Sequence, residues 1–186
     1  MPNRIAIFDR KSQLSSAKQA LLKKRLRGEI PRTSRSLSIP RSSANSSLPL
    51  SFSQQRLWFL DQLEPNTAVY NLSSVYRLVG KLDCKALERS LNGIVSRHES
   101  LRTTVEMEDD KPIQVIASSL QIDLPVINLS DRPEAERNVD LSQILEIEAG
   151  QSFNLSEGPL VRAKLIQLKE TEHVLFYTTH HIVSDG

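Results

Sequence analysis

The sequence predicts an α/β sandwich, in which helices pack on the faces of a sheet. Segments with helical periodicity and segments with strand periodicity alternate after residue 47. Some predicted strands are joined by a short turn and others by a long helical segment, so both hairpins and crossovers are expected. The 186 residues are 39% hydrophobic and 25% charged, which is the composition of an ordinary globular domain with one core.

The first part of the chain differs from the rest in charge and composition. Residues 1–41 contain eleven Lys and Arg and two acidic residues, a charge of +9, and since the whole chain carries +2 the remainder carries −7. Residues 15–28 predict a short helix with Ser15 or Ser16 as its N-cap. Residues 32–47 are rich in serine and have no period, which indicates a linker.

We therefore expect a basic helix and linker over residues 1–47, and a globular domain over residues 48–186. The basic segment lacks interleaved aromatic residues and the spacing of DNA-binding motifs, so no nucleic-acid partner is expected. The single cysteine, Cys84, excludes a disulfide framework and fits a small buried residue near a helix start. The sequence has no signal peptide and no apolar run of membrane-spanning length, so we expect a cytoplasmic protein without membrane contact.

Three elements follow the linker. Residues 51–63 predict a helix with a large apolar face, because Ser51 and Gln54 form a capping box and leucines recur at helical spacing. Residues 69–80 alternate and are rich in Val and Tyr, which predicts a strand. Asp83 is expected to cap the next helix. The predicted buried face of that helix consists of Leu87, Leu91, Ile94, Val95 and His98.

The remaining predicted elements are strands and one helix. Residues 101–117 predict two strands joined at residues 108–110. Residues 133–149 predict a helix, with Asp131 as the residue that begins it from outside and Gly150 as the residue that stops it. The last two predicted strands begin at Leu160 and at His173.

The sequence HHIVSDG at residues 180–186 brings together two imidazoles, a carboxylate and a glycine. Strand alternation places His181 and His180 on opposite faces, so the two rings cannot easily act on one ligand. Metal ligands on a strand share a face, and no further Cys or His has ligand spacing, so no metal site is expected. One imidazole is then expected to be structural, whereas His181, with Asp185 four residues later, is a candidate catalytic residue.

Three blocks of the sequence occur in the order found in one known family. They are LSFSQQRLWFLDQLEPNTAVYN at residues 50–71, RHESLRTTV at residues 97–105, and HHIVSDG at residues 180–186. In these blocks the chain resembles the condensation domains of nonribosomal peptide synthetases. The resemblance covers residues 48–186 and implies the N-terminal lobe of a two-lobed domain built like chloramphenicol acetyltransferase, without the C-terminal lobe.

The resemblance implies peptide-bond formation without a covalent enzyme intermediate. The amine of a downstream aminoacyl thioester attacks the carbonyl of an upstream peptidyl or aminoacyl thioester, and a neutral imidazole suits the proton transfer. By resemblance, the site residues are His181 as the base or positioning group, Asp185 and Gly186 beside it, and His180, Arg97 and Arg102 as structural support. We expect Asp185 to form an ion pair with Arg97, or with Arg102 in its place.

The resemblance also implies partners. The substrates arrive on the 4′-phosphopantetheine of upstream and downstream carrier domains, and the C-terminal lobe and an adenylation domain complete the assembly. No cofactor is expected to bind this lobe itself. If Met1 is the true start, the upstream carrier belongs to another protein, and the basic segment is either a docking element for it or a solvated leader.

Other functions carry the same signature. Epimerization domains and wax-ester-forming acyltransferases also have HHxxxDG, although the first two blocks favour condensation. A single lobe lacks half of the channel in which the substrates meet, so we expect the isolated chain to be inactive. A non-catalytic, carrier-docking fragment is therefore the alternative from a different class.

Overall fold

The computed structural model divides the chain into two units, residues 1–44 and 45–186. The described residues are 15–16, 20, 23–24 and 48–184. Those described in the first unit as helical are Ser16, Ala20, Lys23 and Lys24. The rest of the helix predicted over residues 15–28, and the linker predicted after it, lie outside the described residues.

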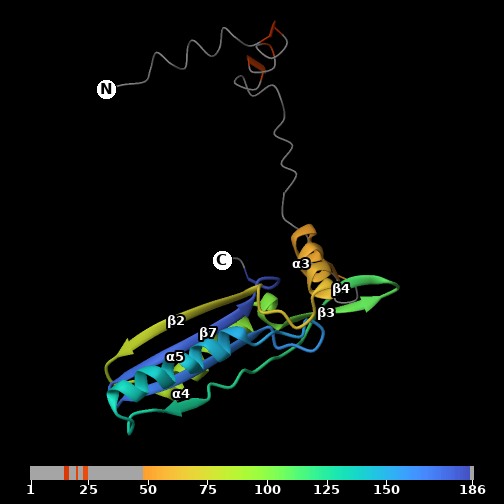
Figure 1. Cartoon of the computed structure of the whole chain (residues 1–186). Coiled ribbons are helices and arrows are strands. Elements are labelled where there is room, and N and C mark those ends of the chain that lie inside the picture. Colours follow the sequence, from red (N-terminus) through yellow and green to blue (C-terminus); the bar gives the residue numbers. More distant parts are fainter. Residues whose placement is uncertain (1–14, 17–19, 21–22, 25–47, 185–186) are drawn as a thin grey trace. The chain divides into compact units, whose positions relative to one another are not determined.

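The second unit contains a four-stranded sheet in the order β2-β7-β6-β5 (Figure 1). Its strands are β2 (Asn71–Val79), β7 (Glu172–His180), β6 (Val161–Lys169) and β5 (Val126–Asn128). Strand β7 pairs antiparallel with both of its neighbours, and in the β2 pair Asn71 lies opposite His180. Strand β5 is parallel to β6, and helix α5 (Glu134–Gly150) lies in the crossover between them. The predicted α/β sandwich with both kinds of connection is confirmed.

A smaller sheet lies at one end of the larger sheet, beside helix α3 (Phe52–Leu63) (Figure 1). Its order is β1-β4-β3, with β1 (Leu48–Pro49), β4 (Lys111–Ile116) and β3 (Thr103–Glu108). The predicted hairpin is confirmed, and its turn residues Asp109 and Asp110 have positive φ angles of 48° and 61°. The first strand begins two residues later than predicted, because a short 3-10 helix (Glu99–Arg102) precedes it.

Two predicted helix starts are confirmed by their side-chain caps. The Ser51 hydroxyl accepts a hydrogen bond from the Gln54 N–H, and the Gln54 side chain accepts one from the Ser51 N–H, which completes the capping box of α3. The Asp83 carboxylate accepts a hydrogen bond of 2.9 Å from the Ala86 N–H at the start of helix α4 (Cys84–Arg97).

Helices α4 and α5 cover opposite faces of the four-stranded sheet. On one face Val95 of α4 packs in a cluster with Val161 and Leu165. On the other face Leu141 and Leu145 of α5 pack against a cluster that includes Ile166 and Phe176. The neighbours Leu165 and Ile166 are both 0% exposed, so β6 is buried on both faces.

Several predictions about the helices are wrong in detail. In α4 the stripe that packs on the sheet consists of Val95, which is buried, and Leu87 and Leu91, which are partly buried, at intervals of four residues. Ile94 is 48% exposed, and His98 is exposed. This stripe is narrow because α4 lies on a single sheet face. The N-cap of α5 is Pro133 rather than Asp131. Gly150 is the last helical residue, and Gln151 is the C-cap that follows it.

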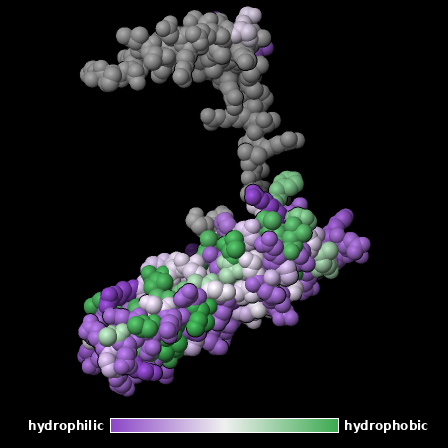
Figure 2. Space-filling view, viewed as in Figure 1, coloured by the Kyte–Doolittle hydropathy of each residue, from purple (hydrophilic) through white to green (hydrophobic). Residues whose placement is uncertain are grey.

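Helix α3 is only partly covered by the rest of the domain. Leu57 and Trp58 pack against a cluster that contains Leu50, Val105 and Ile182, among others. Other apolar side chains of α3 are exposed: Phe52 at 91%, Phe59 at 55% and Leu63 at 61%. Figure 2 shows apolar side chains at this end of the domain. The large apolar face predicted for this helix exists, but much of it faces outward.

Candidate active site

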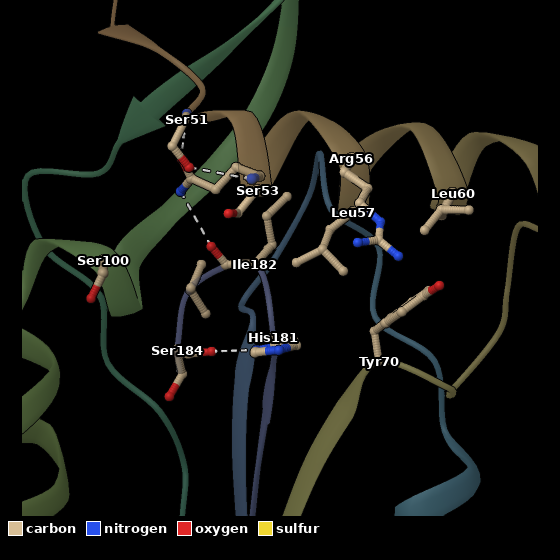
Figure 3. Close-up of a pocket in the computed structure, with 12 residues that line it drawn as sticks. Ser51, Ser53, Arg56, Leu57, Leu60, Tyr70, Ser100, His181, Ile182 and Ser184 are labelled. Atoms are coloured by element: carbon tan, nitrogen blue, oxygen red, sulfur yellow. Dashed lines mark hydrogen bonds between the residues drawn. The ribbon is translucent and has the colours of Figure 1, made fainter. Parts of the chain in front are cut away.

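A cavity of about 820 Å³ opens between α3 and the turn that follows β7. Figure 3 shows Arg56 and Leu57 pointing from α3 into this cavity, with Tyr70 and His181 on its other side. The other lining residues are Ser51, Ser53, Gln54, Leu60, Ser100, Ile182, Val183 and Ser184. Of the two adjacent histidines, only His181 reaches this space.

His181 is the first residue after β7, so it belongs to the turn rather than to the predicted strand. Its Nδ1 lies 2.8 Å from the carbonyl oxygen of Ser184 (Figure 3). A carbonyl oxygen can only accept, so Nδ1 carries the proton and Nε2 of the neutral ring keeps a free lone pair. The backbone N–H of His181 donates to the carbonyl of Tyr70 at 2.9 Å, which fixes the turn against the residue before β2. The bond at Nδ1 favours the neutral tautomer in which Nε2 can accept a proton, as a general base must.

His180 is buried, with 2% of its surface exposed. The edges of the Tyr70 and Phe153 rings enclose its ring, at centroid distances of 6.3 and 6.2 Å. Its Nδ1 accepts a hydrogen bond of 3.1 Å from the Ile182 N–H, so the neutral ring carries its proton on Nε2. Burial, and then the neighbouring His181, lower the pKa of His180 to about 4. His180 is therefore neutral near pH 7 and supports the turn from within the core.

Gln54 connects the start of α3 to this turn. Beside its capping bond, its Nε2 donates to the carbonyl of Ile182 and to the Gln114 side chain, each at 3.2 Å. The spacing of Ser51 and Gln54 predicts only the cap for Gln54, and Arg56 and Tyr70 were not expected in the site. All three lie within residues 50–71, the first of the three blocks that resemble condensation domains. Their position in that block was the one feature of the sequence that could have indicated a place in the site.

We expect Gln54→Ala to lower the free energy of unfolding by about 1–2 kcal/mol, because it removes a capping bond and the bond to Ile182 together. Urea denaturation measures this difference. Gln62→Ala is the matched control, since Gln62 lies on the same helix and, among the described residues, its side chain donates only to its neighbour Asp61. Equal losses in the two variants would contradict the role assigned to Gln54.

The other predicted site residues are not all brought together in the described part of the chain. Arg97 is the last residue of α4 and is exposed. Arg102 donates to the carbonyl of Ala117 and lies 3.7 Å from the Glu99 carboxylate. Asp185 and Gly186 lie outside the described residues, so their predicted places in the site remain predictions.

Within residues 48–184 and the few described residues before them, no group of three or more His, Cys, Asp or Glu is arranged to hold a metal ion. None of the helices in the described part of the chain has both the length and the apolar character to cross a bilayer.

The fold and the site together define an α/β lobe that presents one histidine, at the end of its central strand, to a cavity beside a helix. A family model described as the condensation domain matches residues 44–186. The chain therefore belongs to the condensation-domain family, and the resemblance seen in its three blocks is confirmed. Condensation domains work in multidomain synthetases together with carrier and adenylation domains.

Similar proteins include large synthetases. The chain is 48% identical over 139 residues to a linear gramicidin synthase of Brevibacillus parabrevis, a match that spans 75% of this chain and 3% of that protein. It is 37% identical over 178 residues to phosphinothricin tripeptide synthetase PhsC of Streptomyces viridochromogenes, which spans 93% of this chain and 16% of that protein. The chain thus spans a small part of the length of these relatives.

The solved structures agree on the fold. The starter condensation domain of rhizomide synthetase RzmA has a TM-score of 0.69 and 24% identity to this chain, over 76% of this chain and 34% of that chain. At this identity the likeness shows the fold alone. It supports the predicted architecture, that of the N-terminal lobe of a domain like chloramphenicol acetyltransferase.

Proposed function

We propose that residues 48–186 form the N-terminal lobe of a domain that joins two carrier-bound thioesters through a peptide bond. The observation that carries this proposal is the bond from His181 Nδ1 to the Ser184 carbonyl, which in the neutral form of the ring places the lone pair on Nε2, in a ring that lines the cavity. Membership of the condensation-domain family supports the same reaction.

In the proposed step, the α-amino group of the acceptor thioester attacks the carbonyl carbon of the donor thioester. His181 Nε2 accepts the proton that the amine loses as the new C–N bond forms. The C–S bond of the donor then breaks, and the proton passes to the departing thiolate. Both thiols belong to 4′-phosphopantetheine arms of carrier domains, so the lobe contributes orientation and a base rather than a bound cofactor.

Turnover with loaded carriers tests this function. A protein in which residues 48–186 are followed by a C-terminal condensation lobe should form the peptide product, whereas the 186-residue chain alone should bind carriers without turnover. Inversion of the donor residue without a new peptide bond would indicate an epimerization domain instead. Carrier binding without either reaction in the two-lobed protein would indicate a docking function.

We propose that Asp185 forms an ion pair with Arg97. A guanidinium at the end of α4 can bind a carboxylate through two hydrogen bonds, whereas Arg102 already donates to the Ala117 carbonyl. We expect Asp185→Asn and Arg97→Ala each to lower stability by about 1–3 kcal/mol and to lower activity.

A double-mutant cycle measures this coupling, since partners in one ion pair show non-additive losses. Arg102→Ala is the comparison and should add independently to Asp185→Asn. Non-additivity with Arg102 in place of Arg97 would move the partner to Arg102. Additive losses with both arginines would remove the ion pair.

We propose that the basic segment, residues 1–47, docks an upstream carrier protein. Its charge of +9 over residues 1–41 suits an acidic partner surface, and such attraction is long-ranged but weakened by salt. The match to PhsC spans 93% of this chain, so that similarity includes part of this segment.

Deletion of residues 1–45 should weaken binding of the upstream carrier protein at low salt, and less so at physiological salt. Titration calorimetry of the shortened and the full chain at both salt concentrations measures the difference. Unchanged affinity at both concentrations would leave the segment as a solvated leader.

A further inference from the structure

Arg162 of β6 holds three consecutive residues that lie outside the cavity. Its Nη1 donates to the carbonyl of Ser152 at 2.9 Å, and its Nη2 donates to the carbonyl of Gln151 at 2.6 Å. The guanidinium also lies over the ring of Phe153, with Cζ 3.7 Å from the ring centroid. One side chain thereby fixes the segment that leaves α5.

From this segment a first series of contacts leads to the turn after β7, residues 181–184. The Phe153 ring meets the His180 ring edge to face, with an interplanar angle of 83°. His180 in turn accepts the Ile182 N–H on its ring and the Val183 N–H on its carbonyl, each at 3.1 Å. The turn fixed in this way carries the Ser184 carbonyl that accepts from the His181 ring.

A second series of contacts reaches His181 from its backbone side. The Gln151 carbonyl that accepts from Arg162 also accepts from Asn71 Nδ2 at 2.7 Å. Asn71 is the first residue of β2, and the carbonyl of the preceding residue, Tyr70, accepts the His181 N–H. The two series start at the same guanidinium and meet at the same histidine.

Simple packing of α5 on the sheet does not explain an arginine at this position. The ion pair between Lys164 and Glu148 already joins β6 to α5. Burial lowers the pKa of the Arg162 guanidinium, and its Nε is buried without a hydrogen-bond partner among the described residues. An unpaired buried donor is destabilising, so an apolar residue would serve packing alone at a smaller cost.

We propose that Arg162 is a positioning residue for His181, which it orients through Phe153 and His180 on one side and through Gln151 and Asn71 on the other. This inference rests on the proposed role of His181 as the base. Arg162 itself is not one of the residues that line the cavity.

Nitrogen-15 NMR of the imidazoles in the 186-residue chain tests the positioning. In the unmodified chain we expect the Nδ1–H form for His181 and the Nε2–H form for His180. Arg162→Lys keeps the charge but not the planar fork, and it should shift the His181 signals toward a mixture of both forms. Phe153→Leu should shift them in the same direction, since it interrupts the first series of contacts only.

Lys164→Gln is the matched control, because it removes a β6 to α5 contact on the same strand without touching residues 151–153. It should lower stability and leave both imidazole patterns unchanged. Wild-type imidazole signals in folded Arg162→Lys and Phe153→Leu would overturn the proposal, as would equal shifts in Lys164→Gln.

In the two-lobed protein, Arg162→Lys should lower kcat by on the order of 10- to 100-fold with KM for the carriers little changed, the effect of a misplaced catalytic group. A change in KM alone would contradict positioning. The NMR signals do not depend on turnover, so they test the positioning role of Arg162 separately from the role of His181 as the base. Either role can be contradicted while the other is supported.

Discussion

Replacing His181 with alanine is expected to lower peptide-bond formation by on the order of 100-fold or more, while binding of loaded carriers stays close to that of the unmodified protein. The reason is geometric. His181 is the residue whose imidazole lines the cavity with Nδ1 bonded to the Ser184 carbonyl, and its neighbours Ile182, Val183 and Ser184 have no side chain that can act as a base in its place. Single-turnover kinetics in the two-lobed protein, with both carriers loaded, measure this loss.

His98→Ala is the matched control for that experiment. His98 is an exposed histidine at the end of α4 and does not line the cavity, so its removal should leave turnover unchanged. Near-normal condensation by His181→Ala would exclude the imidazole as base and as positioning group. Loss of carrier binding in the same variant would mean that His181 acts in recognition.

The second large effect is a loss of stability in acid that comes from His180. The ordinary pKa of a histidine is 6.5, and in the folded chain the pKa of His180 is lowered to about 4. Between these values the unfolded state binds more protons, so protonation favours unfolding. This part of the stability is present in full above pH 6.5 and is lost as the pH falls to about 4, and it amounts to about 3 kcal/mol because each pKa unit corresponds to about 1.4 kcal/mol.

Denaturant unfolding between pH 7.5 and pH 4 measures the slope of the free energy of unfolding against pH, in the unmodified chain and in His180→Ala. The variant should be about 1–3 kcal/mol less stable at neutral pH, since it loses a buried ring and the bond to Ile182. Its stability should then depend less on pH over this range. His98→Ala should keep the full slope, and an unchanged slope in His180→Ala would show that the acid sensitivity has another origin.

The sequence was sufficient for elements whose determinants are local. The capping box of Ser51 and Gln54 and the cap at Asp83 each involve residues three positions apart, so the pattern and the bond coincide. The opposite surroundings of His180 and His181 were also expected, although strand alternation is not their cause at His181, which lies in the turn after β7. The architecture of the lobe was predicted from the three blocks that resemble condensation domains.

Elements that depend on distant partners were not predicted. Strands β1 and β5 have two and three residues, too few for a periodic pattern, and they exist because β4 and β6 pair with them. The exposure of Ile94 depends on how α4 meets the sheet, which its own spacing does not encode. The bond from Gln54 to Ile182 spans 128 positions, and the contacts of Arg162 join β6 to the end of α5, so neither has a local signature.

Strand β7 is an inner strand of its sheet, and its position in the sequence also determines when β2 can pair during synthesis of the chain. Within residues 48–184, strand β2 pairs only with β7, and roughly 100 residues separate Asn71 from its opposite residue His180. At about 5–20 residues per second, a ribosome leaves β2 without its neighbour for roughly 5–20 s. During that interval the apolar residues Val75 and Val79 stand on an unpaired strand that other nascent chains can meet. The cavity forms only when β7 enters the sheet, because the turn that follows β7 contributes His181, Ile182, Val183 and Ser184 to its lining.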